Sequence, residues 1–225
     1  MLKCQFHSHC SADPVDAINY SAHQLIDEAA RLQYDVLAIT CHRHLEFSEE
    51  LKQYAAKKEI ILIPGIEFEI NKKHILGINV NEEIYKVDSF KKLEKYKESH
   101  PECLIIAPHP FFPGPSLKET FTENITLFDA VEYSWAYTKN INFNSKAIDL
   151  AIEYRKPIIA TSDCHVLSYL DQGYCFLECE KTVEAIISTI KAGKIKNSHK
   201  PTNYFRIARP IIQVASQTIR RKLKK

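Results

Sequence analysis

Short apolar runs alternate with longer amphipathic stretches along most of this chain. The runs lie at Val36 to Thr40, Ile60 to Ile63, His74 to Val80, Cys103 to Ala107 and Pro157 to Thr161, after a first strand-like segment at Leu2 to Phe6. Most are rich in β-branched residues, and turn or polar residues bound them, as is usual for buried parallel strands. Helical patterns lie between them, so the sequence predicts repeated βα units, and their number favours a barrel over an open sheet.

Length and composition are those of a globular protein with one domain. The 225 residues are 45% hydrophobic and 26% charged, and 30 Lys and Arg against 28 Asp and Glu leave a net charge of +2. This balance disfavours a globally basic nucleic-acid binder. No apolar run approaches the roughly 18 residues of a membrane span, and no signal-peptide pattern is visible, so we expect a cytoplasmic protein.

Two further absences narrow the class of protein. With only 5 Gly and neither GxGxxG nor GxxxxGK[ST], the sequence has no loop that would cradle a nucleotide phosphate. Its seven Cys form no CxxC pair, which favours buried thiols over disulfides. Lys and Arg accumulate after Gly193, so we expect one domain over residues 1–200 and a basic helical tail over 201–225, packed on the domain or extending from it. A solvated tail is favoured over a contact with an anionic membrane or nucleic acid.

Polar residues with metal-binding side chains fall just after the apolar runs. They are His7 and His9 after the first segment, then His42, Glu67, His109, Asp163 and His165 after later ones. In a parallel barrel, residues just past the carboxyl ends of the strands converge on one face, where such enzymes build their active sites. His74 opens the run that follows Glu67, so we expect it to be a further ligand.

Imidazole and carboxylate ligands together suit Zn²⁺, Mn²⁺ or Fe²⁺. In His7-Ser8-His9 the alternation of a strand points both rings the same way, and Asp163-Cys164-His165 has the same spacing. Each motif alone is weak, because an isolated HxH is more often incidental. Together they predict a metal site. The surroundings of His23, His100 and His199 favour ordinary structural or surface roles, and His44 is intermediate.

The motifs resemble those of the PHP family, named for polymerase and histidinol phosphatase domains. The matching segments are FHSHCSADP (6–14), LAITCH (37–42), PGIEFE (64–69), KHILG (73–77), APHP (107–110) and ATSDCH (160–165). The resemblance implies a distorted barrel of seven β/α units over residues 1–200 and a metal-dependent phosphoesterase activity.

The resemblance also implies up to three ions. One would be held by His7, His9, Glu67 and Asp163; a second by His42, His165 and an acid of the first loop; a third by Glu67, His74 and His109. We choose Asp13 as the first-loop acid, with Asp16 as the alternative. The family's usual Thr-Asp-His reads Thr40-Cys41-His42 here, so a carboxylate that could orient His42 is missing.

The expected reaction is hydrolysis of a phosphate ester by a metal-activated water in a di- or trinuclear site. The candidate catalytic residues are Glu67, Asp163 and His165, and the leaving oxygen would take its proton from a metal-site histidine or from Asp163. The substrate would be a small phosphorylated metabolite or nucleotide. Arg43 and Lys139 are candidate phosphate contacts, although a solvated surface role fits them equally well. Tyr133, Trp135 and Tyr137 fit core packing better than an aromatic wall around a ring.

Three alternatives stay open. A carbon–nitrogen hydrolase could use the same ions, and the altered Cys41 position gives weight to a non-catalytic, metal-binding regulatory module. The basic tail motivates a nuclease, although nucleic acid is less favoured as a partner than a small phosphorylated substrate.

Overall fold

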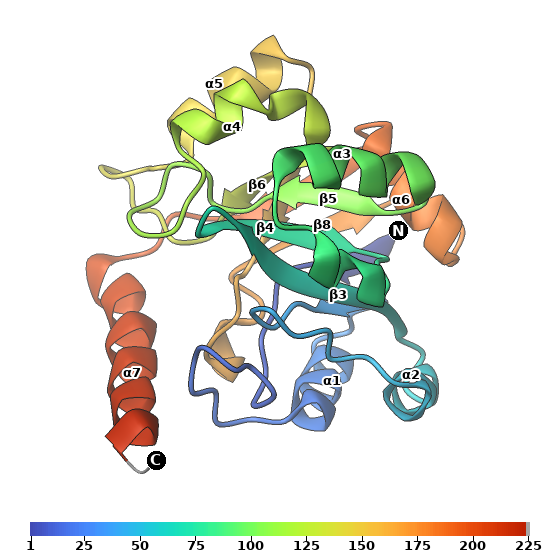
Figure 1. The fold of residues 1–225 in the computed structure, drawn as a ribbon. Coiled ribbons are helices and arrows are strands. Elements are labelled where there is room, and N and C mark those ends of the chain that lie inside the picture. The colour runs from blue at the N-terminus through green and yellow to red at the C-terminus, as the bar shows by residue number, and fades with distance from the viewer. Residues whose placement is uncertain (224–225) are drawn as a thin grey trace.

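One mixed sheet, curled into a nearly closed barrel, forms the centre of the computed structural model (Figure 1). The structure describes residues 1–223, except for several side chains between positions 210 and 223. Its strands are β1 (Leu2–Gln5), β2 (Val36–Ile39), β3 (Ile61–Ile70), β4 (Lys73–Ile78), β5 (Leu104–Ala107), β6 (Ala130–Ser134), β7 (Ile158–Thr161), β8 (Gly173–Leu177) and β9 (Ile195–His199). They neighbour one another in the order β7-β6-β5-β4-β3-β2-β1-β8-β9.

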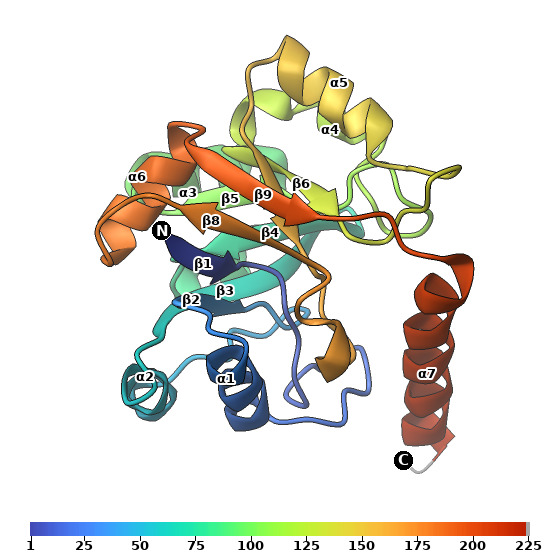
Figure 2. The same ribbon diagram turned by 180° about the vertical axis from the view of Figure 1, so that it is seen from behind.

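Helices surround the sheet, and all but the last, α7, lie against its outside (Figures 1 and 2). They are α1 (Ala22–Arg31), α2 (Glu49–Ala56), α3 (Phe90–Ser99), α4 (Glu119–Glu123), α5 (Ser145–Glu153), α6 (Val183–Lys191) and α7 (Tyr204–Leu223), with 3-10 turns η1 (Glu82–Lys86), η2 (Ile125–Leu127) and η3 (Leu167–Tyr169). Helix α1 begins at a capping box on Ser21 and buries Leu25, Ile26 and Ala29. The capping box fixes its start, and apolar residues three to four positions apart give it one buried face.

The predicted α/β barrel is confirmed, but its strands are not all parallel. The pairs β1–β2, β2–β3, β5–β6 and β6–β7 are parallel, whereas β3–β4, β4–β5, β1–β8 and β8–β9 are antiparallel. Only Asn71 and Lys72 separate β3 from β4, and both have positive φ (52° and 61°). Such a two-residue turn reverses the chain into a hairpin and leaves no room for a crossover helix.

The two ends of the sheet meet at a seam between β7 and the β8–β9 pair. The side chain of Asn197 in β9 accepts a hydrogen bond from the backbone of Ala160 and donates one to the carbonyl of Ile158, each at 2.8 Å. A Cβ atom at Gly173 would lie 2.4 Å from the carbonyl oxygen of Thr161, so only glycine permits this approach. Buried apolar side chains such as Phe6, Ile63 and Ile106 pack in the same core cluster.

Helix α7 lies beside the barrel rather than on the sheet (Figure 2). The expected tail over 201–225 is helical from Tyr204 to Leu223, while the side chains of its basic run, 220–225, lie outside the described residues. Within residues 1–223, no helix combines the length and apolarity needed to cross a membrane.

Candidate metal centre

Backbone pairing beyond the strand ends brings the two histidine motifs together. The amide of His9 donates to the carbonyl of Cys164 at 3.0 Å, and the amide of Cys164 donates to the carbonyl of His7 at 3.2 Å. Residues 7–9 after β1 therefore run alongside residues 163–165 after β7. A similar bridge joins His42 to Glu67, because the amide of Glu67 donates to the carbonyl of Cys41 at 3.2 Å.

Four donor atoms converge at the centre of this arrangement. His7 Nε2 lies 3.3 Å from Glu67 Oε2 and 3.2 Å from Asp163 Oδ1, and His9 Nε2 lies 3.5 Å and 3.3 Å from the same two oxygens. Ligands about 2.0–2.1 Å from a tetrahedral ion are separated by about 3.3–3.4 Å. The four donors are thus spaced as they would be around one divalent cation.

Unpartnered buried atoms support the same fit. In the described part of the chain, His9 Nε2, His74 Nδ1, Glu67 Oε1 and Asp163 Oδ1 are buried without a hydrogen-bond partner. Buried polar atoms are almost always hydrogen-bonded, so several orphaned donors and acceptors that face one another need an explanation. A set of imidazole nitrogens and carboxylate oxygens suits Zn²⁺, Mn²⁺ or Fe²⁺.

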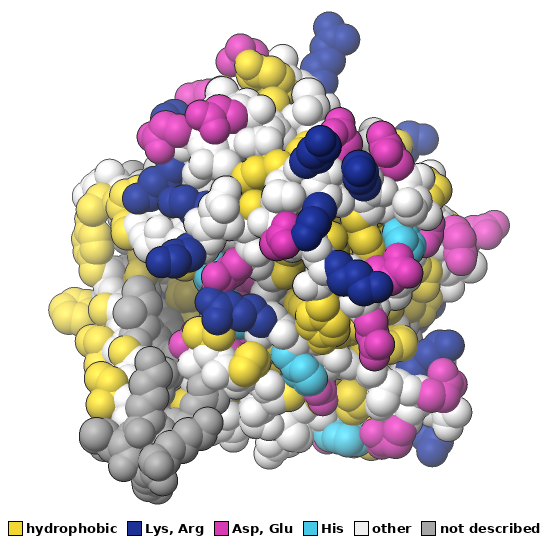
Figure 3. Space-filling view, in the orientation of Figure 1, with side chains coloured by type: hydrophobic (Ala, Val, Ile, Leu, Met, Phe, Trp, Pro, Cys, Tyr) yellow, Lys and Arg dark blue, Asp and Glu magenta, His cyan; other side chains and the backbone are white. Residues whose placement is uncertain are grey.

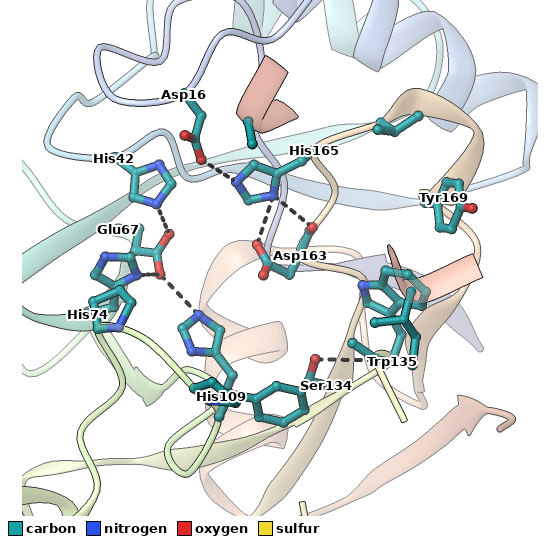
Figure 4. A pocket seen from close by; sticks show the side chains of 17 residues that line it. Asp16, His42, Glu67, His74, His109, Ser134, Trp135, Asp163, His165 and Tyr169 are labelled. Carbon is teal, nitrogen blue, oxygen red and sulfur yellow. Dashed lines mark hydrogen bonds and ion pairs between the residues drawn. The ribbon is translucent and has the colours of Figure 1, made fainter. Parts of the chain in front are cut away.

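The two oxygens of Glu67 face different groups of histidines (Figure 4). Oε2 lies 3.1 Å from His42 Nε2 and is the oxygen directed at the first group of donors. Oε1 lies 2.7 Å from His74 Nδ1 and 3.4 Å from His109 Nε2. The 2.7 Å pair does not have hydrogen-bond geometry, since both of its atoms are left without a partner. The arrangement fits a carboxylate between two cations.

A further group of possible ligands gathers around His165. Donor atoms of His9, His42 and His165 lie within 4.8 Å of one another, and His165 Nε2 lies 3.1 Å from Asp16 Oδ2. Asp16 comes from the loop between β1 and α1 and lines the cavity described below. These side chains could hold an additional ion.

Asp13 lies behind the histidines. Its Oδ2 is 2.9 Å from His9 Nδ1 and 2.8 Å from His42 Nδ1, and its Oδ1 accepts hydrogen bonds from the amides of Val15 and Asp16. A carboxylate on Nδ1 fixes the ring and leaves Nε2 to face a ligand. The geometry gives the chosen residue, Asp13, an orienting position and places the alternative, Asp16, in the cavity.

Glu132 of β6 does for His7 what Asp13 does for its two histidines, and sequence reasoning missed it. Glu132 is 1% exposed; its Oε1 lies 2.7 Å from His7 Nδ1 and accepts from the Thr161 hydroxyl, and its Oε2 accepts from the amide of His109 at 2.6 Å. The available signal was a carboxylate inside the otherwise buried strand AVEYS, because Glu is almost never buried without partners.

The buried charges compensate one another. Burial alone would lower the pKa of His7, but the carboxylates of Asp163 and Glu132 raise it well above its ordinary value. Burial alone would raise the pKa of Glu67, but His74 and other imidazoles hold it well below its usual range. Cations that bind His7 compete with protons for its imidazole nitrogens, so metal affinity depends on pH.

Two of the candidate ligands sit on strained backbone. His109 and Asp163 have φ of 34° and 43°, in the left-handed region that residues with a Cβ rarely adopt. Each such residue costs about 1–3 kcal/mol and persists only where its surroundings hold it. Both lie just beyond strand ends, and the turns direct His109 toward Glu67 and Asp163 toward His7 and His9.

A cavity of about 410 Å³ opens beside these donors (Figure 4). It is lined by Asp16, His42, Glu67, His74, His109, Phe112, Pro113, Pro115, Ser134, Trp135, Ala136, Asp163, His165, Val166, Tyr169, Ile207 and Ala215. His7, His9 and Asp13 are more deeply buried. The structure therefore brings the predicted ligands together at one cavity.

The two predicted phosphate contacts are not at this cavity. The guanidinium of Arg43 donates to Glu69 Oε1 at 2.7 Å and 3.0 Å, and Lys139 is exposed elsewhere. Of the three aromatic residues considered, Trp135 lines the cavity, against the expectation of core packing. Tyr133 and Tyr137 belong to a core cluster, as expected, and Tyr133 stacks on His199 with ring centroids 3.8 Å apart.

The altered Cys41 position has an apolar environment. Cys41 is fully buried, and its Sγ lies 3.5 Å from Sγ of Cys10. Both thiols belong to the core cluster that contains Leu37 and Ile39 of β2. The thiol thus faces the core rather than the donors, and Asp13 is the carboxylate that contacts His42 here.

Comparison with known proteins agrees with the motifs. Residues 142–195 match the PHP-associated family PHP_C. No curated protein matches the chain. A solved two-domain protein of Bacteroides vulgatus, containing a predicted PHP-like metal-dependent phosphoesterase, is 18% identical with a TM-score of 0.68, over 95% of this chain and 69% of that one.

Two further solved structures share the fold. PsfC of Pseudomonas syringae is 14% identical with a TM-score of 0.68, over 100% of this chain and 99% of that one. Endonuclease Q, bound to duplex DNA with an abasic lesion, is 14% identical with a TM-score of 0.63, and the match covers 89% of this chain but 60% of the endonuclease. The family match and the shared fold confirm the resemblance of this chain to the PHP family.

Proposed function

We propose that this protein hydrolyses a phosphate ester with the help of two or three divalent cations. The observation that carries the proposal is the position of Glu67, whose two oxygens face two groups of imidazoles in a buried cluster. Such a carboxylate between two groups of nitrogen ligands is suited to bridge cations. Paired cations are a common device for phosphoryl chemistry.

Three groups of side chains would each hold one cation. His7, His9, Glu67 and Asp163 would hold one ion; His74 and His109 would complete a site on the other side of Glu67; and His42, His165 and Asp16 would form a third. We take Asp16 rather than Asp13 as the first-loop ligand, because Asp13 already contacts the Nδ1 atoms of His9 and His42. Divalent cations bound there would lower the pKa of a water molecule and offset charge on the phosphoryl oxygens.

We assign the proton of the leaving alcohol to one of two cavity residues, His165 or Asp163. The His165 ring lies between two carboxylates, with Nδ1 3.2 Å from Asp163 Oδ1 and Nε2 3.1 Å from Asp16 Oδ2. Both His165 and Asp163 line the cavity. Whichever of the two is not bound to a cation could hold a proton there and donate it to the leaving oxygen.

The test begins with metal content. Protein purified without chelators is analysed for Zn, Mn and Fe, reconstituted with each, and assayed for phosphate release from a panel of phosphate esters. Glu67→Gln is expected to lower both metal content and phosphate release, since it weakens two sites together. Glu59→Gln, at an exposed position just before β3, is the matched control and should retain both. Full metal content and full activity in Glu67→Gln would contradict the proposal.

The remaining candidates give different results when DNA and amide substrates are assayed alongside the phosphate esters. A nuclease, motivated by the fold shared with Endonuclease Q, would cleave DNA and leave small esters intact. A carbon–nitrogen hydrolase would act on amides, and a regulatory module would bind metal without turnover of any substrate. Amide hydrolysis or metal binding without turnover would overturn the proposal, whereas cleavage of DNA alone would restrict it to phosphodiesters.

A further inference from the structure

The cavity beside the metal donors has a second, chemically different side. Its lining there is apolar, and the residues are Phe112, Pro113, Pro115, Trp135, Ala136, Val166, Tyr169, Ile207 and Ala215. We propose that this side binds an aromatic ring, so that the substrate is a small phosphate monoester of an alcohol that carries one. The inference rests on the proposed phosphoesterase function and names the substrate class.

Trp135 and Tyr169 form the wall against which the ring would pack. Their own rings lie 5.1 Å apart between centroids and are tilted by 58°, and only 6% of Trp135 and 8% of Tyr169 is exposed. Figure 4 shows them together on the side of Asp163 away from His74. Rigid, buried aromatic side chains offer a ring both apolar contact and edge-to-face packing at little entropic cost.

The lining also limits how many charged groups the substrate carries. None of the described residues around the cavity is Lys or Arg, and the guanidinium of Arg43 is bonded to Glu69. The negative charge of a phosphoryl group would therefore be met only on the metal side. A second phosphate, as in a polynucleotide, would have to lie on an apolar surface without a cation, which is costly.

The described surface on one face of the molecule carries charges of both signs. On the face seen in Figure 3, the coloured Lys and Arg side chains are interspersed with Asp and Glu. Nucleic-acid sites that bind through the backbone rely on a continuous basic stripe. The observations favour a small monoester over DNA or RNA.

Size and closure fit a small molecule. A volume of about 410 Å³ lies within the usual range for small-ligand pockets. Helix α7 contributes Ile207 and Ala215 to the lining, and its approach is fixed where the amide of Thr202 donates to the carbonyl of Tyr137 at 2.9 Å. The helix thus encloses the apolar side of the cavity.

The chain provides its own reporter for the test, because Trp135 is its single tryptophan. Metal-loaded protein is titrated with phenylphosphonate and with methylphosphonate, which carry no ester bond to hydrolyse. We expect phenylphosphonate to bind about tenfold more tightly and to change the tryptophan fluorescence. Equal affinities, or a fluorescence unchanged by saturating phenylphosphonate, would overturn the inference.

Calorimetric titration of variants with the two phosphonates shows which residues cause the preference for the phenyl group. Tyr169→Ala should reduce the advantage of the phenyl group several-fold, and Trp135→Phe should largely preserve it by keeping an aromatic wall. Tyr154→Ala, at an exposed tyrosine after α5, is the control and should change neither affinity. If Tyr169→Ala lowered the affinity for both phosphonates equally, a role of Tyr169 in ring recognition would be contradicted.

Turnover separates this inference from the proposed function. 2-Phenylethyl phosphate should have a kcat/KM at least tenfold above that of ethyl phosphate, an ester whose leaving alcohol is of similar acidity. If neither ester is hydrolysed while phenylphosphonate binds preferentially, the phosphoesterase proposal fails and the ring site stands. If both are hydrolysed equally and both phosphonates bind equally, the function stands and the ring site is wrong.

Discussion

Nδ1 of His7 lies 2.7 Å from Oε1 of Glu132, so the imidazole presents its Nε2 atom to Glu67 and Asp163. The pair joins β6 to the segment after β1, two parts of the chain 125 residues apart. Among the described residues, Glu132 is the only carboxylate outside the predicted ligand set that contacts the His7 ring.

Glu132→Gln is expected to weaken metal binding about 10- to 100-fold, the usual effect of losing a carboxylate that orients a ligand. In the variant, an amide NH2 group would replace one of the two carboxylate oxygens. It would then face either the amide of His109, or the His7 ring together with the Thr161 hydroxyl. Competition with a chromophoric chelator measures the metal affinity. Glu94→Gln, at an exposed position on α3, is the control, and an affinity equal to wild type in Glu132→Gln would refute this role.

The two acids of the first loop should respond differently to amide substitution. Asp13→Asn removes the charge that orients His9 and His42 and should lower both the melting temperature and the metal content. Asp16→Asn should lower metal content with a smaller effect on folding, because Asp16 is less buried and lines the cavity. Thermal melts of the chelator-treated proteins and elemental analysis separate the two effects. The assignment is reversed if Asp13→Asn folds normally and alone loses an ion.

Stability of the metal-free protein should fall as the pH rises above neutrality. Burial lowers the pKa of His7, His42, His109 and His165, but neighbouring carboxylates outweigh it and raise all four, whereas burial dominates and lowers that of His9. A histidine whose pKa is higher in the folded state than in the unfolded state stabilises the fold. This stabilisation is fully present below the unfolded-state pKa of about 6.5 and is lost as the pH rises through the folded-state pKa.

At low pH, protonation of the buried carboxylates lowers the stability of the metal-free protein. Burial raises the pKa of Glu67 and Asp163, but the imidazoles outweigh it, so their contribution exists above about pH 4 and is lost as pH falls further. Metal competes with the imidazole protons, so the gain in melting temperature on adding Zn²⁺ or Mn²⁺ should grow with pH. Melts from pH 5 to 9, with and without metal, measure both trends; a metal-induced gain independent of pH would contradict them.

Restoring the family's aspartate should harm this protein. Cys41→Asp would place a carboxylate in a fully buried position beside Cys10 and near Asp13, with apolar neighbours from β2. We expect a loss of about 3 kcal/mol in the free energy of unfolding, as for an unpaired buried charge. Urea denaturation measures it, with Cys41→Ala as the control that keeps the site uncharged. An unchanged midpoint in Cys41→Asp would show that a cationic partner is available there.

The sequence predicts most of the strands that are apolar runs, although β8, GYCFL, is missed, as are two strands with a weaker apolar pattern. Val36–Ile39 and Leu104–Ala107 are short, buried and β-branched, and both form where expected. Strand β6 was missed because Glu132 interrupts its apolar pattern, and β9, IKNSH, because it has little apolar pattern at all. The antiparallel direction of β4 follows from the conformation of two turn residues, which apolar periodicity does not report.

The site residues that follow directly after strands can be predicted from the sequence. His7, Glu67 and Asp163 follow apolar runs, and a barrel alone brings such positions together. The position of Asp13 depends on hydrogen bonds that its own side chain makes to the amides of Val15 and Asp16, which shape the loop. Spacing cannot supply that geometry, nor the direction of a long surface side chain such as Arg43.

The donor atoms lie on the strands and just past their ends, whereas the apolar side of the cavity comes mainly from loops and α7. Phe112 and Pro115 belong to the loop after β5, and Trp135 and Val166 to those after β6 and β7. Under the two proposals above, ion binding and ligand selection would fall to different parts of the polypeptide. A chain organised in this way can acquire new selectivity through changes in loop length or composition while its catalytic machinery is inherited intact.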